Sequence, residues 1–342
     1  MDTRALQQLR ESLAEKKHNL TAWLRGSSPG ERRTRTGPLG ERQVEEHLQS
    51  IESALEKADQ NTLGLCDVCH DYVETSRLEM DYTACICLDH LTGPERTRLE
   101  ADLELSQKVQ RALLPNDVPS LATLEIAAFS QPAHIVGGDY FDFVRMRDGS
   151  HAIVIADVMG KGMSASLLMA SLQASLRIIA PEASAPAEIA ARLNHLFCNN
   201  IRLTKFVTFF IARYDEPTGR LTYCNAGHNP PLVLRGGTVV EQLLPTGAAI
   251  GLVEHADFTE NEIVLRSGDI VLMYTDGVVE SWNPGQELFG QDRLEKCLRE
   301  SGALPAQRII YALRNRLQSF TAAAPLTDDT TIVVIRRLAG ET

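Results

Sequence analysis

Carboxylates stand at the borders of apolar runs in the second half of the chain, where their positions could serve catalysis. The acidic residues are Asp139, Asp157, Asp276 and the adjacent pair Asp328 and Asp329. The apolar runs that flank the last four cover residues 151–156, 270–275 and 331–335. An aspartate at the end of a buried strand is held rigidly, and its charge then needs a compensating partner, usually a cation.

These carboxylates form a set of hard oxygen ligands, which suits Mg²⁺ or Mn²⁺ better than zinc. Two such ions could bind phosphate oxygens, neutralise developing charge and lower the pKa of a bridging water that attacks phosphorus. Such hydrolysis needs no nucleophilic Ser or Cys. Taken singly, Gly-Gly-Asp and Asp-Gly are common turn dipeptides. Their joint occurrence beside β-rich runs predicts a metal-dependent phosphatase site.

A second set of residues has the spacing of a zinc site. Cys66 and Cys69 form one C-x-x-C pair, and Cys87 and His90 form a C-x-x-H pair after seventeen intervening residues. Four thiolate and imidazole ligands can close a tetrahedral structural site that stabilises a stretch too short for its own core. Cys85 is an alternative to Cys87, and free thiols in a small subdomain are the alternative to zinc. The other cysteines are expected to be buried free thiols, namely Cys198, Cys224 and Cys297.

The elements that precede the acidic motifs are helical. Residues 1–25 and 41–60 each carry one apolar stripe, the second with heptad spacing, and residues 26–40 between them are rich in Gly and Pro. The pattern predicts an antiparallel helical hairpin, although two helices on a larger core would look alike. A further helix is expected over residues 95–114, after Pro94.

From about residue 120 the pattern changes to short β-rich runs separated by turns. Strands are expected near residues 151–156, 206–214, 221–225, 232–234, 270–274 and 331–335. Helices are expected near residues 163–180, 186–200, 290–301 and 305–321. The close strand spacing favours antiparallel sheets with helices outside, an α+β fold. We therefore divide the chain into a hairpin (1–63), a zinc finger (64–94), a linker helix (95–115) and a catalytic domain (116–340).

Composition limits the function classes. The 342 residues are 44% hydrophobic and 23% charged, as in ordinary globular proteins. No apolar run approaches the ~20 residues that span a bilayer, and the N-terminus lacks a signal-peptide core. We expect a cytoplasmic protein that does not bind membranes. The net charge of −11 argues against broad nucleic-acid binding.

Residues 100–338 closely resemble the SpoIIE/RsbU-like branch of the PPM (type 2C) Ser/Thr phosphatases. The matching segments are VQRALLP at 109–115, GGDYFD at 137–142, DVMGKG at 157–162, NAGHNPP at 225–231, YTDGV at 274–278 and DDTT at 328–331. The resemblance implies an α-β-β-α sandwich of two antiparallel sheets flanked by helices, with two Mn²⁺ or Mg²⁺ ions at one end. It also implies a bacterial source.

The resemblance further implies roles for individual residues. Asp157 would bridge the two metal ions, and the carbonyl of Val158 would help to bind one of them. Asp276 and Asp328 would complete the sphere of the other ion. Asp139 would bind directly or through a water. Asp157, Asp276 and Asp139 are thus the expected catalytic set, while the residues that bind substrate stay unassigned.

Some positions leave their roles open. Asp329 is less favoured as a ligand than its neighbour. Eukaryotic relatives place a His, proposed as general acid, where this chain has Met159, so the proton for the leaving group must come from water or another residue. His228 is a candidate donor, but Gly-His-Asn-Pro also fits a rigid turn whose ring bonds backbone. Lys161 could bind phosphate or be an ordinary surface lysine.

Residues 1–94 resemble the DksA/TraR family of zinc-finger proteins. The shared features are the leading hairpin, the C-x-x-C pair, Arg77-Leu78-Glu79, Thr83-Ala84 and the spacing to Cys87. Most of that family has Cys in place of His90. Members that act on RNA polymerase carry acidic residues at the hairpin tip, where this chain has an arginine-rich loop.

The two resemblances together imply a regulated phosphatase. Its substrate would be a serine-phosphorylated regulator similar to an anti-sigma-factor antagonist, and the linker helix could pair two chains as a homodimer. One alternative is a catalytically silent protein that binds RNA polymerase or another partner. Another is a diguanylate cyclase, suggested by Gly-Gly-Asp-Tyr-Phe, but this assignment leaves the later aspartates unexplained.

Overall fold

The computed structural model describes most of the chain as two compact units, Met1–Asp102 and Leu103–Thr342. The described residues are 40–60, 62–73, 84–115, 117–200, 205–322, 324 and 326–339, with positions 10, 13, 14, 17, 18, 21, 22, 24, 25 and 78.

The first unit contains the helix α3, Gly40–Asp59, which corresponds to the second expected helix. Ile51 and Ala54 on α3 are buried with Leu13 and Leu63. Ion pairs join Arg10 to Asp59 at 2.6 Å and Lys17 to Glu52 at 3.1 Å, so the partners run in antiparallel order. Most of residues 1–39, including the arginine-rich loop, lie outside the described residues, and the complete hairpin therefore stays a prediction.

The helix α5, Gly93–Leu113, contains the boundary between the units. It matches the helix expected over residues 95–114. Pro94 lies in the first turn, where its missing N–H costs no intrahelical hydrogen bond, and Pro115 follows the last turn.

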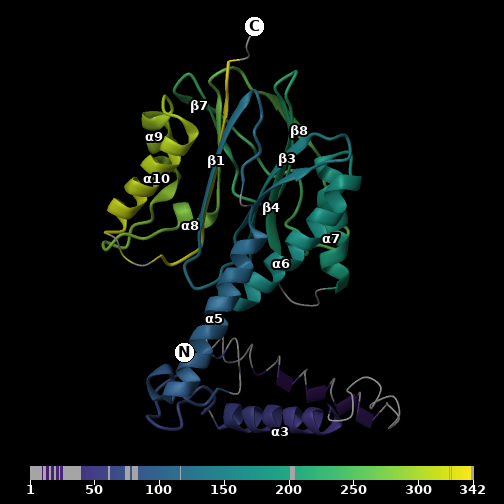
Figure 1. Ribbon diagram of the computed structural model, residues 1–342, viewed down its shortest axis with the longest axis vertical. Coiled ribbons are helices and arrows are strands. Elements are labelled where there is room, and N and C mark those ends of the chain that lie inside the picture. The colour runs from purple at the N-terminus through teal and green to yellow at the C-terminus, as the bar shows by residue number, and fades with distance from the viewer. Residues whose placement is uncertain are drawn as a thin grey trace. The chain divides into compact units, whose positions relative to one another are not determined.

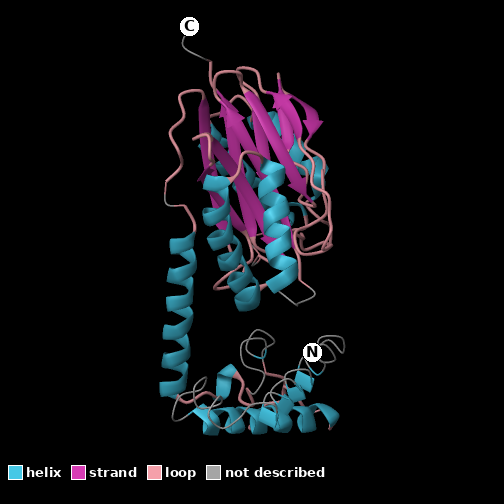
Figure 2. Ribbon diagram, turned by 90° about the vertical axis from the view of Figure 1, so that its right-hand side faces the viewer, coloured by secondary structure: helices cyan, strands magenta, loops and turns pink. Residues whose placement is uncertain are grey.

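The second unit is built from two five-stranded antiparallel sheets (Figure 2). The first sheet has the order β1-β10-β9-β6-β7, with bounds Leu124–Gln131, Thr330–Arg337, Ile270–Tyr274, Leu232–Arg235 and Thr238–Gln242. The second has the order β2-β3-β4-β5-β8, with bounds Tyr140–Arg145, His151–Val158, Val207–Asp215, Arg220–Ala226 and Asn261–Val264. Each expected strand is present, whereas β1, β2, β7 and β8 were not predicted.

Helices cover the outer face of each sheet (Figure 1). Helices α6 and α7 lie on the second sheet, and α9 and α10 lie on the first. Their bounds are Gly162–Ile179, Pro186–Asn200, Gly290–Ser301 and Ala306–Phe320, and two short helices, η2 (Ala180–Glu182) and α8 (Asp276–Val279), complete the unit. The four longer helices match the expected ones within two residues at each end.

The strand pattern explains how the sheets stack. In β3, Ile153 and Ile155 belong to the cluster between the two sheets, whereas Val154 and Ala156 belong to the cluster beneath α6 and α7. Alternate side chains point to opposite faces of a strand, so a strand that is apolar throughout is buried on both faces. The result is the expected α-β-β-α order of layers.

The expectation that no apolar run approaches the length that spans a bilayer is wrong. Within the described residues, the stretch Gly162–Glu182 is long and apolar enough to cross a membrane. Its buried positions, including Leu172 and Leu176, pack in the core against the second sheet. A core helix of this kind passes the same test of length and hydropathy.

Candidate active site

Antiparallel pairing brings the acidic motifs to one end of the two sheets. Tyr140 of β2 pairs with Ala156 of β3, so Asp139 and Asp157 occupy the next positions at the same end of the second sheet. In the first sheet, Ile332 of β10 pairs with Tyr274 of β9. The start of β10, which follows Asp328 and Asp329, therefore lies beside the end of β9, which precedes Asp276.

The charges of these carboxylates act on one another. Burial and then the charges of Asp276, Asp328 and Asp329 raise the pKa of Asp157 to about 7. Burial and the charges of Asp328 and Glu280 raise the pKa of Asp276 to about 6. The structure thus brings the predicted carboxylates together, and it adds Glu280, whose charge reaches Asp276 although no sequence motif singled it out.

Asp139 has an oxygen atom that lacks a partner. The side chain is buried, and its Oδ2 accepts a hydrogen bond from Thr275 Oγ1 at 2.8 Å. Its Oδ1 is buried with no hydrogen-bond partner among the described residues. Burial and the charges of Asp157 and Asp329 raise its pKa well above the usual value. An orphaned carboxylate oxygen beside other carboxylates fits a site for a divalent cation.

Asp329 is used differently from its neighbour. Its carboxylate accepts hydrogen bonds from the backbone N–H groups of Ala133 at 2.8 Å and Gly138 at 2.6 Å, which holds the loop before β2. A Cβ atom at Gly137 would lie 2.3 Å from Asp329 Oδ2, and one at Gly277 would lie 2.0 Å from its backbone oxygen. Glycine is therefore required sterically at both positions.

Gln110, on the last turns of α5, contacts the same loop. Its buried side chain donates a hydrogen bond from Nε2 to the Gly137 carbonyl at 2.5 Å and accepts one from the Gly137 N–H at 3.0 Å. Sequence inspection placed Gln110 in a family motif but gave it no role. The local signal that could have found it is the amide side chain beside Val109 in the motif at 109–115.

Lys161 lies at the rim of the carboxylate cluster. Its Nζ is 2.8 Å from Asp328 Oδ2, and it also donates a hydrogen bond to the Thr327 carbonyl. Its positive charge opposes the rise in the pKa of Asp157 and of Asp276. The lysine therefore contacts the predicted site, which an ordinary surface lysine would not.

His228 is poorly suited to donate a proton. The ring is buried, and this burial lowers its pKa to about 3, so it is neutral at pH 7. Met159, at the position where eukaryotic relatives have a His, is half exposed and offers no proton. Protonation of the leaving group by solvent is consistent with both observations.

The four predicted zinc ligands lie together in the first unit. The ligand atoms of Cys66, Cys69, Cys87 and His90 are all within 4.8 Å of one another. Cys87 Sγ is 3.1 Å from His90 Nδ1 and 3.8 Å from Cys69 Sγ. Burial raises the pKa of Cys66, but backbone N–H groups outweigh it and lower the value to about 6, which favours the thiolate that metals bind.

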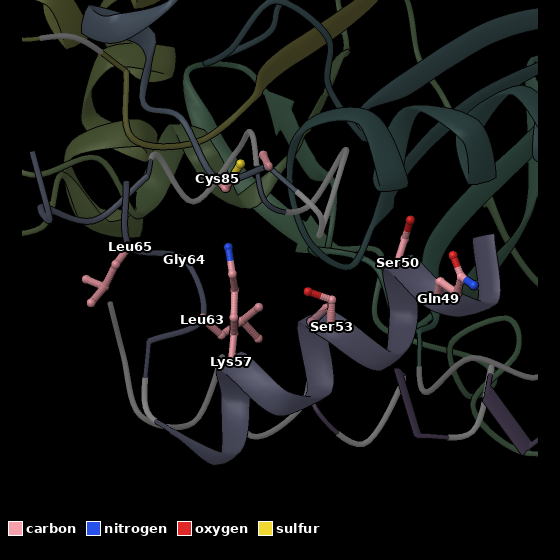
Figure 3. A pocket seen from close by; sticks show the side chains of 10 residues that line it. Gln49, Ser50, Ser53, Lys57, Leu63, Gly64, Leu65 and Cys85 are labelled. Carbon is pink, nitrogen blue, oxygen red and sulfur yellow. The ribbon is translucent and has the colours of Figure 1, made fainter. Parts of the chain in front are cut away.

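Cys85, the alternative ligand, is engaged elsewhere. Its thiol forms a hydrogen bond with the carboxylate of Asp67, and this interaction raises the pKa of Cys85. It lines a cavity of about 370 Å³ together with polar residues of α3, among them Ser53 and Lys57 (Figure 3). The geometry therefore favours Cys87 as the third thiol of the cluster.

The stacked sheets and their shared acidic end define a serine/threonine phosphatase domain of the PP2C type. Residues 147–338 match the family model described as Stage II sporulation protein E (SpoIIE). The chain belongs to this SpoIIE family.

Two curated relatives extend the comparison. The chain is 30% identical over 243 residues to phosphoserine phosphatase RsbU of Bacillus subtilis (strain 168). This alignment covers 70% of this chain and 71% of RsbU. It is 29% identical over 264 residues to protein IcfG of Synechocystis sp., covering 69% of this chain. The match spans less than half of IcfG, namely 41% of its length.

Two solved structures share the fold. The SiaA-PP2C domain of Pseudomonas aeruginosa has a TM-score of 0.63 at 23% identity, covering 70% of this chain and 98% of that domain. The RsbU and RsbW domains of a Mycobacterium tuberculosis protein give a TM-score of 0.55 at 28% identity, covering 67% of this chain and 64% of theirs. These similarities confirm the predicted α+β fold with two antiparallel sheets and flanking helices.

Proposed function

We propose that this protein is a cytoplasmic, metal-dependent phosphatase that hydrolyses phosphoserine or phosphothreonine on a small regulatory protein. The observation that carries the proposal is the convergence of Asp139, Asp157, Asp276 and Asp328, with an orphaned oxygen on Asp139, in a member of the SpoIIE family. The relative RsbU bears the name phosphoserine phosphatase. The proposed substrate resembles the phosphorylated antagonist of an anti-sigma factor.

The carboxylates would hold two Mn²⁺ or Mg²⁺ ions. In this assignment Asp157 would help to hold both ions, the Val158 carbonyl one of them, and Asp276 and Asp328 the other, and Asp139 would complete the set. When bound, the ions would neutralise phosphate charge and make a water molecule acidic enough to attack phosphorus. The cluster of buried carboxylates fits this role because cations would offset both the burial and the mutual repulsion that raise their pKa values.

The remaining side chains position the loop that carries Asp139 and offer a positive charge to the substrate. Asp329 and Gln110 hold the loop that carries Asp139 from two sides, through Gly138 and Gly137. Lys161 places an ammonium group at the rim of the site. Once this group is released from Asp328, it can bind the phosphate of a substrate. The chain itself therefore supplies order and charge around the reaction.

Phosphate release from the full-length protein tests this proposal. With a phosphoserine peptide or p-nitrophenyl phosphate as substrate, we expect turnover with millimolar Mn²⁺ and none after treatment with EDTA. A phosphorylated anti-sigma-factor antagonist should be hydrolysed faster than a free phosphopeptide. Absence of phosphate release with either Mn²⁺ or Mg²⁺ would contradict the proposed activity.

We also propose that Cys66, Cys69, Cys87 and His90 bind one structural zinc ion in a DksA/TraR-like finger that regulates the phosphatase. The four ligand atoms already lie within 4.8 Å of one another, and four protein ligands leave no open position for catalysis.

Zinc content distinguishes the ligand cysteines from their neighbour. The purified protein should contain about one zinc ion per chain, because four such ligands complete a tetrahedral site. Cys87→Ser should lose most of it, whereas Cys85→Ser should retain it, since the Cys85 thiol bonds Asp67 instead. Elemental analysis of both variants gives the answer, and the reverse pattern would make Cys85 the ligand.

A homodimer through α5 is part of the proposal. Leu105 and Val109 lie one turn apart on this helix and are 60% and 54% exposed. Two apolar side chains at this spacing can pack against the same pair of a second chain.

A further inference from the structure

The turn that follows β5 is built around a buried histidine for which the proposed reaction has no use. The N–H of His228 donates to Asn225 Oδ1 at 2.8 Å, and Asn225 Nδ2 donates back to the His228 carbonyl at 3.1 Å. Both residues are buried. The side chain of Asn225 therefore fixes the backbone of the turn, and the ring of His228 is not needed for this.

One side of the ring contacts the second sheet. His228 Nδ1 lies 2.8 Å from Thr208 Oγ1. Thr208 is on β4, where it is the register partner of Asp157 on β3, and its hydroxyl lies 3.5 Å from the Asp157 carbonyl. The ring thus touches the residue that directly neighbours the proposed bridging ligand.

The other side of the ring faces the first sheet. His228 Nε2 is buried and makes no hydrogen bond of ordinary geometry with the described residues. The chain after His228 enters β6, where Leu232 pairs with Leu272 of β9, so the turn reaches the first sheet beside the end of β9. In keeping with this position, the Tyr274 backbone opposes the fall in the pKa of His228 that burial causes. Tyr274 ends β9, two residues before Asp276.

These surroundings favour one tautomer. If Nε2 carries the proton, Nδ1 can accept the Thr208 hydroxyl proton, and Nε2 presents an N–H and not a lone pair to the Tyr274 backbone. The other tautomer would bury the Nε2 lone pair against a carbonyl group. Because burial keeps the ring neutral at neutral pH, this arrangement does not depend on a change of charge.

We propose that His228 is a positioning residue that braces Thr208 on β4 against Tyr274 on β9 and thereby sets the distance between Asp157 and Asp276. The two sheets have separate hydrogen-bonded ladders and meet largely through apolar side chains, which specify their relative position less sharply than directed polar contacts. At the acidic end the hydrogen bond from Thr275 to Asp139 is one such contact, and His228 adds a second one beside Asp157. The inference rests on the proposed metal site, because the spacing matters only if both carboxylates hold the same ions. Partners behind metal ligands commonly alter affinity by about 10- to 100-fold.

Direct Mn²⁺ binding to the full-length protein, followed by electron paramagnetic resonance, tests the brace. Thr208→Val keeps the shape of the side chain but removes the hydroxyl group, and His228→Leu removes both ring nitrogens. We expect each variant to need about 10-fold more Mn²⁺ for half-saturation, with turnover recovering in excess Mn²⁺. The double variant should be no weaker than His228→Leu, because both changes break one connection.

Thr222→Val is the matched control, because Thr222 lies on β5 opposite Arg213, away from the acidic end. It should bind Mn²⁺ as the unaltered protein does. A purely structural role for His228 would lower the melting temperature of the variants but leave half-saturation unchanged.

Wild-type Mn²⁺ affinity in both folded variants would overturn the brace while leaving the proposed function intact. If His228→Leu does not fold, the shape-conserving Thr208→Val decides alone. If the unaltered protein binds Mn²⁺ and the variants bind it weakly, but no phosphate is released, the brace stands and the proposed function fails.

Discussion

Asp157→Asn should reduce Mn²⁺-dependent phosphate release at least about 10³-fold, the scale on which removal of a group that stabilises the transition state acts. The substitution removes the negative charge of the residue proposed to contact both ions. Asp276→Asn should have a comparable effect. Initial rates at saturating Mn²⁺ measure the loss, and Asp148→Asn, at the opposite end of β3, is the control that should keep full activity.

The same variant should fold at least as well as the unaltered protein when metal is absent. The pKa of Asp157 is raised to about 7, so its ionised form opposes folding. This destabilisation is present above pH 7 and disappears as the pH falls toward the usual carboxyl pKa of about 4. Near pH 8 without metal, Asp157→Asn should therefore melt at an equal or higher temperature, whereas Mn²⁺ should stabilise only the unaltered protein.

Near-normal turnover in both Asp157→Asn and Asp276→Asn would refute the assigned site. Loss of turnover accompanied by a lower melting temperature in metal-free buffer would indicate misfolding instead of lost chemistry. The combination of lost activity and retained stability is thus the distinguishing result.

Asp142→Ala should lower the stability of the second unit by about 3 kcal/mol, because breaking a buried ion pair leaves its partner uncompensated. Asp142 is fully buried on β2, and Arg177 of α6 reaches it with hydrogen bonds of 2.8 and 2.6 Å. The Tyr140 hydroxyl also donates to it. Since Arg177 is half exposed, the loss should fall at the lower end of the range for buried pairs.

Thermal unfolding measures this effect, and a loss of about 3 kcal/mol corresponds to a fall of about 6–12 °C in a domain of this size. Asp148→Ala breaks an exposed pair with Arg213, at 3.3 Å, and should shift the melting temperature far less. Replacing both Asp142 and Arg177 with Leu and Met should recover part of the loss. An Asp142→Ala shift no larger than that of Asp148→Ala would contradict the argument.

Local pattern was sufficient to predict most elements of the second unit. The apolar runs of β3, β4 and β9 are buried on both faces, so their composition alone marks them as strands. By contrast, β7 and β8 are short strands whose residues are mostly exposed. Their position depends on neighbouring strands, which no local pattern encodes.

The candidate site shows the same division. Asp157 and Asp276 could be predicted because each carboxylate directly follows an apolar run, a signal carried by adjacent residues. The contacts of Gln110 with Gly137 and of His228 with Thr208 join residues 27 and 20 positions apart. Such contacts arise from tertiary packing, so the sequence pattern assigned no role to Gln110 and suggested for His228 only a proton donor or a rigid turn.

The ammonium group of Lys161 on Asp328 has a consequence for how ions enter the site. A divalent ion that binds Oδ2 of Asp328 would compete there with a tethered monovalent charge, so that loading would be an exchange between cations. The displaced lysine cannot diffuse away, and its effective concentration stays constant in any buffer. Metal at low concentration would therefore bind more weakly than it would to the same carboxylates without the lysine.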